Sequence, residues 1–321
     1  MVQWEIFLEQ KPILVIRIRS RITKLGISIV DFIQWFIQGF IYWFITPMQH
    51  EFMVKAILVS ALVGLVCSAL SCYMTLKGWA LMGDAVSHAV LPGVVIAYVM
   101  NLPLAIGAFV FGVGSVIAIG FIKAKTRIKE DTVIGLVFTG FFALGLVLVS
   151  KIRSTIDLTH ILFGNVLGIS DSDIIQTIII SVITLVTLAI LRKDLILFCF
   201  DSTHARSIGL NTTFLYYTLL SLLSLTAVAG LQTVGIILVV AMLVTPGATA
   251  YLLSDRFDHM TLIAMALGVF SSVMGTYISY HIDGSTGGCI VVLQTILFVL
   301  AMIFAPKHGI IAQSKNTEIN Y

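Results

Sequence analysis

Long apolar runs dominate this chain and restrict it to a membrane. Nine runs of about 20 mostly apolar residues follow one another between positions 53 and 305, each long enough to cross a hydrocarbon core about 30 Å thick as one helix. Only 11% of the 321 residues are charged, whereas soluble domains carry about 25%. Because lipid offers no partner to an unpaired backbone group, each span is expected to be a helix. The sequence therefore predicts an all-α, polytopic membrane protein with about nine transmembrane helices.

The basic residues between the runs predict how the chain is oriented in the membrane. If the first span starts outside, nearly all of these residues lie on the cytoplasmic side, as the positive-inside rule requires. Short basic loops of this kind indicate topology rather than nucleic-acid binding, so no nucleic-acid partner is expected. The expected spans are 53–76, 79–100, 104–122, 131–150, 173–191, 212–229, 233–253, 260–279 and 287–305.

The two ends of the chain lie outside this block of spans. Residues 1–50 are predicted to form a basic N-terminal extension that includes an apolar segment at 28–47 with a polar face. This segment either crosses the membrane as a tenth helix or lies in the interface as an amphipathic helix, and the residues leave both open. The transmembrane domain is placed at 51–306 and a cytoplasmic tail at 307–321.

Two ionisable side chains interrupt the run 79–100. Asp84 and His88 are four residues apart and share one face of a helix. At about 1.5 Å per residue, His88 lies roughly 14 Å from Trp79, near the middle of the bilayer core. Pro92 has no N–H to donate to the carbonyl of His88, which predicts a helix break there. Ionisable groups at this depth usually mark a transport path or ligand site; a hydrogen-bonded pair between helices is the structural alternative.

The ligand count at Asp84 and His88 indicates more than one copy of the chain. One carboxylate and one imidazole are too few to hold a divalent ion stripped of water, whereas two copies around a twofold axis supply twice as many. Mixed oxygen and nitrogen donors suit Mn²⁺, Fe²⁺ or Zn²⁺, and the absence of nearby thiolates argues against Cu(I). We therefore expect a homodimer with a path for a transported metal, and no tightly bound cofactor.

Two further features have both a functional and a structural interpretation. Asp157 and His160 lie three residues apart near the predicted outer mouth, where they attract a cation or form a solvated helix face. Pro246 breaks the run 233–253, either to form a gate or only to bend and pack the helix.

The polar segment 200–210 is predicted to form a short cytoplasmic helix. Asp201 or Ser202 can cap its start, and Gly209 can end it in the left-handed conformation. Such a helix offers a rigid contact to a soluble partner, or it is an ordinary surface helix. The chain contains no GxxxxGK[ST] phosphate loop, so it is not expected to hydrolyse ATP itself.

At this point the sequence resembles a known family. The segment 77–93, KGWALMGDAVSHAVLPG, closely resembles the signature of the ABC-3 family, the membrane subunits of manganese, zinc and iron ABC importers. Further matches lie at 159–165, 200–210 and 239–250, and the resemblance extends over about residues 41–307.

The resemblance implies a permease that dimerises, pairs with two separate ATPase subunits and receives its cation from a metal-binding extracytoplasmic protein. It places Asp84 and His88 on the metal path. The 200–210 segment corresponds to the coupling helix that docks on the ATPase, which includes Asp201, His204, Arg206 and Gly209.

The expected function is therefore that of the transmembrane subunit of an ATP-driven importer working by alternating access. Manganese is favoured as the substrate, with zinc or iron next. Two other classes stay open: an ion-coupled secondary transporter or channel that uses Asp84 as a relay, and a non-transporting scaffold. The expected location is a cell inner (plasma) membrane, or a plastid membrane if the chain is organelle-encoded.

Overall fold

The computed structural model describes residues 45–79, 82–102, 104–151, 169–306 and 309–311. The chain divides into two compact units, Met1–Glu51 and Phe52–Tyr321. Within the described residues all regular structure is helical, which confirms the prediction of an all-α protein. The segment predicted to span or lie in the interface at 28–47 falls outside the described residues, apart from its last three.

The helices of the second unit follow the predicted spans. Eight helical segments in the described part of the chain are long and apolar enough to cross a membrane, and α5 and α6 together form one of them. The run predicted at 233–253 forms α14, of which the apolar part, Leu238–Leu253, is shorter than the other spans. The helices are α4 (Glu51–Lys77), α5 (Met82–Ala89), α6 (Leu91–Val99), α7 (Leu104–Lys125), α8 (Glu130–Lys151), α10 (Asp171–Ile190), α11 (Arg192–Phe200), α12 (Ser202–Ser207), α13 (Thr212–Val234), α14 (Ile236–Leu253), α15 (Phe257–Ile282) and α16 (Thr286–Phe304).

Two boundaries differ from the predicted ones. Helix α13 continues to Val234 rather than ending near residue 229, and the single residue Gly235, at φ 87°, separates it from α14. Glycine adopts this φ without a Cβ penalty, so one residue is enough to start a new helix. The helix α11 was not predicted as a separate element, and it follows α10 after a break at Leu191.

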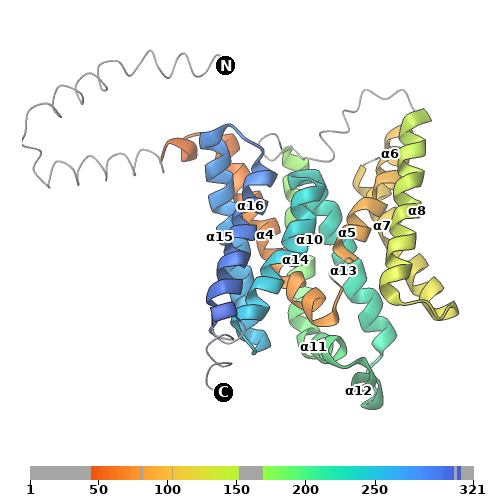
Figure 1. Ribbon diagram of the computed structural model, residues 1–321. Coiled ribbons are helices and arrows are strands. Elements are labelled where there is room, and N and C mark those ends of the chain that lie inside the picture. Colours follow the sequence, from red (N-terminus) through yellow and green to blue (C-terminus); the bar gives the residue numbers. More distant parts are fainter. Residues whose placement is uncertain (1–44, 80–81, 103, 152–168, 307–308, 312–321) are drawn as a thin grey trace, which may run out of the picture. The chain divides into compact units, whose positions relative to one another are not determined.

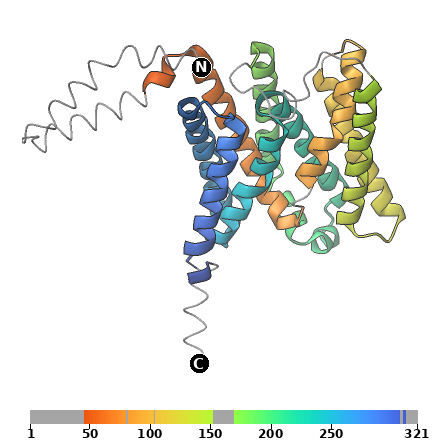
Figure 2. The same ribbon diagram turned by 45° about the horizontal axis from the view of Figure 1, so that its top comes forward.

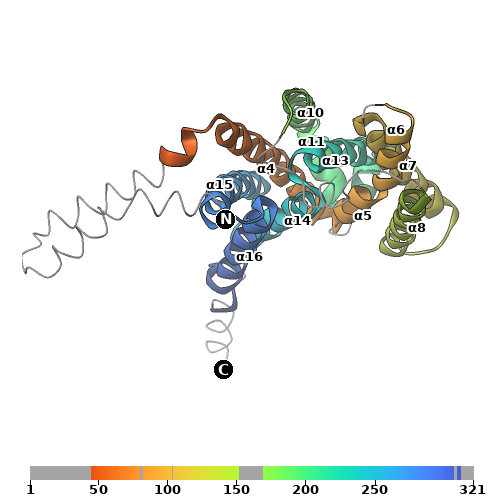
Figure 3. The ribbon, with the colours of Figure 1, turned by 90° about the horizontal axis from the view of Figure 1, so that it is seen from above.

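The spans separate into interior and peripheral helices. In α4, α5–α6 and α13, between 67% and 72% of the span is buried inside the unit, against 22% to 39% for the other full-length spans. Figure 3 shows α15 and α16 at one end of the unit and α7 and α8 at the other, with α13 and α14 between them. The peripheral apolar faces are therefore the ones available to lipid or to another protein.

Small residues let the interior helix α4 approach the peripheral helix α15 closely. Gly64 of α4 and Gly268 of α15 face each other, and a Cβ at either position would overlap the backbone of the other helix. The neighbouring hydroxyls of Ser68 and Ser272 donate to carbonyls four residues earlier, at 2.6 and 2.7 Å. These contacts satisfy the hydroxyls without water, as close helix packing inside a membrane requires.

The short helices α11 and α12 lie at one end of the unit. Figure 1 shows α11 and α12 at the lower end, where α4 stops and α7 turns toward α8, and the tilted view of Figure 2 shows the same arrangement. The connections at this end carry Lys77, Lys123, Lys125, Arg127, Lys129, Arg192, Lys193, Arg206 and Arg256. Helix α12 therefore lies on the side that the positive-inside rule assigns to the cytoplasm.

Candidate functional site

The helix that carries Asp84 and His88 begins after a sharp reversal of the chain. Gly78, at φ 74°, ends α4, and the N–H of Trp79 donates to the carbonyl of Met74 at 2.9 Å. This six-to-one hydrogen bond, with a left-handed glycine, is the Schellman pattern of a helix C-terminus. Within α5, Asp84 lies in the first turn and His88 in the last, where each complements the helix dipole.

The span that carries Asp84 and His88 consists of two helical segments that meet just before Pro92. Helix α5 ends at Ala89, Val90 forms a turn, and α6 begins at Leu91 with Pro92 in its first turn. Because Pro92 lacks an N–H, it cannot donate to the carbonyl of His88, and the first helical turn is the position where this loss costs least. His88 is the seventh of the 18 residues in the span Met82–Val99, so the break lies in the middle of a crossing.

Asp84 and His88 contact each other directly. The His88 Nδ1 atom lies 3.0 Å from the backbone carbonyl oxygen of Asp84 and 3.3 Å from its Oδ1 atom. Both oxygens are acceptors, so in the neutral imidazole Nδ1 carries the proton and donates to them. The lone pair is then on Nε2, which no side chain hydrogen-bonds within the described ranges. Asp84 thus orients the ring as the carboxylate partners of metal-binding histidines do.

The two side chains lie on the face of α5 that the described part of the chain leaves exposed. Asp84 and His88 are 39% and 22% exposed, whereas the other residues of α5 are buried. Two aromatic rings of α8, Phe138 and Phe142, meet His88 edge-on with ring centroids 5.1 and 5.3 Å away. The pair is therefore bounded by apolar rings on one side, and the described residues leave its other side open.

The described residues of one chain do not complete a metal site. No cluster of three or more His, Cys, Asp or Glu side chains that could hold a metal ion occurs in the part of the chain that the structure describes. The available donors at this position are an Asp84 carboxylate oxygen and the Nε2 atom of His88. Divalent transition metals take four or more ligands, so the described residues of one chain do not supply a full set.

The other sequence-predicted residues fall into those that the structure describes and those that it does not. Asp157 and His160 lie outside the described residues. Pro246 lies inside the continuous helix α14. Next to it, the hydroxyl of Ser71 on α4 accepts from the N–H of Gly247 at 2.9 Å and donates to the carbonyl of Val244 at 3.2 Å. This exchange of hydrogen bonds across helices favours the packing interpretation of Pro246 over a gate.

The short helix α12 has the predicted caps at both ends. The Asp201 carboxylate accepts from the backbone N–H groups of Thr203 and His204 at 2.8 and 2.9 Å. At the other end Gly209 has φ 89°, and the N–H of Leu210 donates to the carbonyl of Ala205. His204 and Arg206 are exposed between the caps. A six-residue helix fixed at both ends is a rigid projection from the unit.

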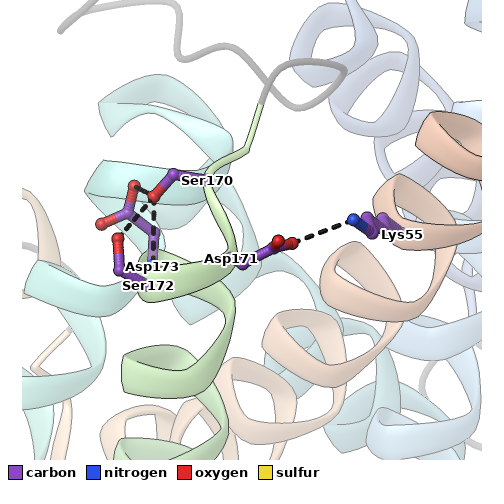
Figure 4. Close-up of polar contacts among 5 residues, drawn as sticks. All are labelled: Lys55, Ser170, Asp171, Ser172 and Asp173. Atoms are coloured by element: carbon purple, nitrogen blue, oxygen red, sulfur yellow. Dashed lines mark hydrogen bonds and ion pairs between the residues drawn. The ribbon is translucent and has the colours of Figure 1, made fainter.

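The outer end of the unit is joined by an ion pair between two spans. Figure 4 shows Lys55 of α4 reaching Asp171 at the start of α10, with Nζ to Oδ1 at 2.9 Å. The same figure shows Ser170 capping α10, where its hydroxyl accepts from the N–H of Asp173. Both partners of the ion pair are exposed, at 39% and 80%, so the pair contributes about 0–1 kcal/mol. The Ser170 cap and the acidic first turn determine where α10 begins.

We expect loss of the Asp201 cap to loosen α12. In the Asp201→Ala variant the amides of Thr203 and His204 lose their acceptor, so their hydrogen exchange should accelerate, while Asp201→Asn should stay close to the parent because Asn also caps. The hydrogen bond from the His204 N–H is the main reason that the pKa of Asp201 lies below its ordinary value. Amide exchange measured by mass spectrometry across a pH series checks both expectations.

The sign of this pH dependence follows from the lowered pKa. The stabilisation is complete above about pH 4, the ordinary pKa of an unfolded Asp, and is lost as the pH falls through the lower folded pKa. Protection of the two amides that is independent of pH down to pH 2, or that is unchanged in Asp201→Ala, would contradict the assignment.

The sequence did not identify the aromatic neighbours of His88. Phe138 and Phe142 are four residues apart, which places them on one face of α8, but this spacing does not tell which helix they face. The tertiary packing of α8 against α5 brings them to the imidazole.

The fold and the site together define a class. A polytopic helical membrane protein with a broken span and ionisable groups at mid-depth is a membrane transport protein. The model of the ABC 3 transport family matches residues 49–305, and the chain belongs to this family.

Relatives of the chain are named as membrane proteins of metal transport systems. The manganese transport system membrane protein MntB of Synechocystis sp. is 66% identical over 274 residues, which cover 85% of this chain and 90% of that protein. The chelated iron transport system membrane protein YfeD of Yersinia pestis is 53% identical over 258 residues, or 80% of this chain and 87% of its own length. The structure of PsaBC from Streptococcus pneumoniae in complex with Fab superimposes with a TM-score of 0.77 at 38% identity, and the match covers 85% of this chain and 98% of that one.

Proposed function

We propose that this chain is the permease subunit of an ATP-driven importer for divalent transition metal ions, with Mn²⁺ as its main substrate. The Asp84–His88 pair carries the proposal, because a carboxylate and an imidazole whose Nε2 has no hydrogen-bond partner among the described residues lie on a face of the span that those residues leave exposed. Oxygen and nitrogen donors of this kind suit Mn²⁺. The similarity to the manganese protein of Synechocystis supports the choice of metal.

The half-complete site favours a homodimer. If two copies place their α5 helices against each other, the Asp84 and His88 pairs supply two carboxylates and two imidazole nitrogens. The two negative charges neutralise a 2+ ion and remove most of the cost of holding it at mid-membrane. Phe138 and Phe142 then exclude lipid and water from one flank of the imidazole, which strengthens the metal–ligand interaction.

Energy and delivery must come from other subunits. The chain has no phosphate-binding loop, so we assign ATP hydrolysis to separate ATPase subunits that dock on α12 through the surface of His204 and Arg206. A metal-binding extracytoplasmic protein delivers the ion at the end of the unit that carries Lys55 and Asp171. In alternating access, the movement of the ATPases reaches α5 and changes the side to which the metal site opens. The corresponding location is the inner (plasma) membrane.

Ferrous iron is the second candidate substrate. The ligand set accommodates Fe²⁺ as well as Mn²⁺, and the chelated iron protein of Yersinia pestis supports this alternative. For zinc, the support is limited to the types of ligand, which are also compatible with Zn²⁺.

The metal preference is tested by competition. The experiment measures uptake of radiolabelled Mn²⁺ by cells that express the complete transporter. We expect unlabelled Mn²⁺ to inhibit this uptake at a concentration about tenfold lower than the concentration of Fe²⁺ or Zn²⁺ that gives the same inhibition. Cells that express the Asp84→Asn variant give the background. Equal or stronger inhibition by Fe²⁺ would indicate that iron, and not manganese, is the main substrate. Unchanged uptake in cells that lack the ATPase subunits would instead indicate a secondary transporter.

A further inference from the structure

The helix α11 lies between the short helix α12 and the body of the unit, and it is held at both of its ends. At its start, Arg192 forms an ion pair with Asp258 in the first turn of α15. At its end, the ammonium of Lys77 donates to the carbonyl oxygen of Phe198 at 3.3 Å. Only Asp201 separates α11 from α12, so a movement of α12 must pass into α11.

Lys77 contacts both the backbone and the side chain of Phe198. The last four carbonyls of a helix lack partners within the helix, and the dipole makes them attract cations. Lys77 meets the carbonyl of Phe198 and also lies 4.3 Å from the centroid of its ring, in cation–π range. The Phe198 side chain is 3% exposed, so it is packed into the core and cannot follow the ammonium freely. Lys77 also lies 6.0 Å from the ring centroid of Trp79.

Lys77 is the last residue of α4 and lies at the turn that leads to α5, the helix that carries Asp84 and His88. Gly78 follows in the left-handed conformation, then Trp79, and α5 with Asp84 begins three residues later. The ring of Trp79 meets Tyr216 of α13 edge-on with centroids 5.3 Å apart. One face of this turn is therefore attached to α11 through Lys77, and the other face to α13 through Trp79.

We propose that Lys77 is a positioning residue that couples α12 to the metal-binding helix α5. When the ATPases move α12, α11 carries the carbonyl of Phe198 with it, and Lys77 transmits the displacement to the turn at Gly78 and so to Asp84 and His88. Lys77 does not touch the metal and does not contact the ATPase. This inference rests on the function proposed above, and it adds the element through which hydrolysis and transport are linked.

The test compares ATP hydrolysis and Mn²⁺ uptake in the same proteoliposomes, with the complete transporter. Lys77→Met keeps the length of the side chain and removes the charge and the donors, and Lys77→Arg restores both. Lys193→Met removes an exposed lysine of α11 itself and serves as the matched control. The readout is the number of ions taken up per ATP hydrolysed, which separates coupling from a general loss of structure.

For Lys77→Met we expect hydrolysis to continue while uptake per ATP falls about tenfold, because a charge-assisted hydrogen bond and a cation–π contact are lost together. Lys77→Arg should recover at least about half of the ratio, since it keeps the charge and a donor. Lys193→Met should match the parent. A parental ratio in Lys77→Met overturns the proposal, and so does an equal loss of hydrolysis and uptake in an intact complex.

A second variant covers the case in which Lys77→Met does not assemble. Phe198→Leu leaves the carbonyl in place and removes only the aromatic face, so we expect the ratio to fall about two- to fivefold. An unchanged ratio in Phe198→Leu would then overturn the proposal. Failure of the proposed function itself is recognised separately, because the parent complex would show no ATP-driven uptake.

Discussion

Replacing Asp84 with Asn, or His88 with Ala, is expected to abolish metal uptake while the transporter still assembles. Each change removes one of the two ligands that the chain contributes, and in a dimer the loss is doubled. Asp84→Asn also removes the negative charge that offsets the ion. Because outer partners of metal ligands alone are worth about 10- to 100-fold, we expect uptake to fall by at least about 100-fold.

The control for this experiment lies on the same helix. Ser87 lies between Asp84 and His88 in the sequence, but its side chain is buried. Its hydroxyl donates to the carbonyl of Gly83 at 2.7 Å. We expect Ser87→Ala to retain uptake within about twofold, since a side chain–backbone bond of this kind is a minor term in a helix. Uptake of labelled Mn²⁺, normalised to the amount of assembled complex, measures all three variants. Normal uptake in Asp84→Asn or His88→Ala would rule out the assigned metal path.

The second large effect is a loss of stability, and it is expected where α6 crosses α7. Helix α6 directly follows α5, the helix that carries Asp84 and His88. Gly93 and Gly107 face each other so closely that a Cβ on either glycine would overlap the carbonyl oxygen of the other. The Cβ of Gly107→Ala would also approach Ala97 to 2.7 Å. The helices must move apart to accept the methyl group, so we expect Gly107→Ala to destabilise the protein by about 1–3 kcal/mol.

A glycine in open space on the same helix gives the opposite expectation. A Cβ at Gly114 of α7 would meet nothing within 4 Å. Gly114→Ala should therefore leave stability unchanged or raise it by up to about 1 kcal/mol, because alanine loses less conformational entropy in a helix. Thermal unfolding of the purified protein in detergent compares the two variants. Equal melting temperatures for Gly107→Ala and Gly114→Ala would contradict the close crossing of α6 and α7.

The sequence predicted most of the fold because membrane spans follow from length and hydropathy alone. The break near Pro92 and the caps at Asp201 and Gly209 were also predictable, since each depends on the chemistry of one or two residues. The boundary at Gly235 was missed because the residues on both sides are apolar, so hydropathy does not change there. The helix α11 was missed because it follows the preceding span almost without interruption.

The candidate site was predictable only in part. Asp84 and His88 were identified from the cost of ionisable groups in a membrane, and their spacing placed them on one face. The rings of Phe138 and Phe142 and the link from Lys77 to Phe198 depend on tertiary packing. No local pattern in the sequence specifies which carbonyl or which ring a side chain meets on a distant helix.

ATP-dependent uptake of Mn²⁺ into proteoliposomes tests the central claim most directly. The vesicles contain this chain with its ATPase subunits and the metal-delivery protein, and labelled Mn²⁺ is followed with and without ATP. The account predicts saturable uptake that requires both ATP and the ATPase and that disappears with Asp84→Asn. Uptake by the chain alone, or equal ATP-driven uptake with Asp84→Asn, would contradict it.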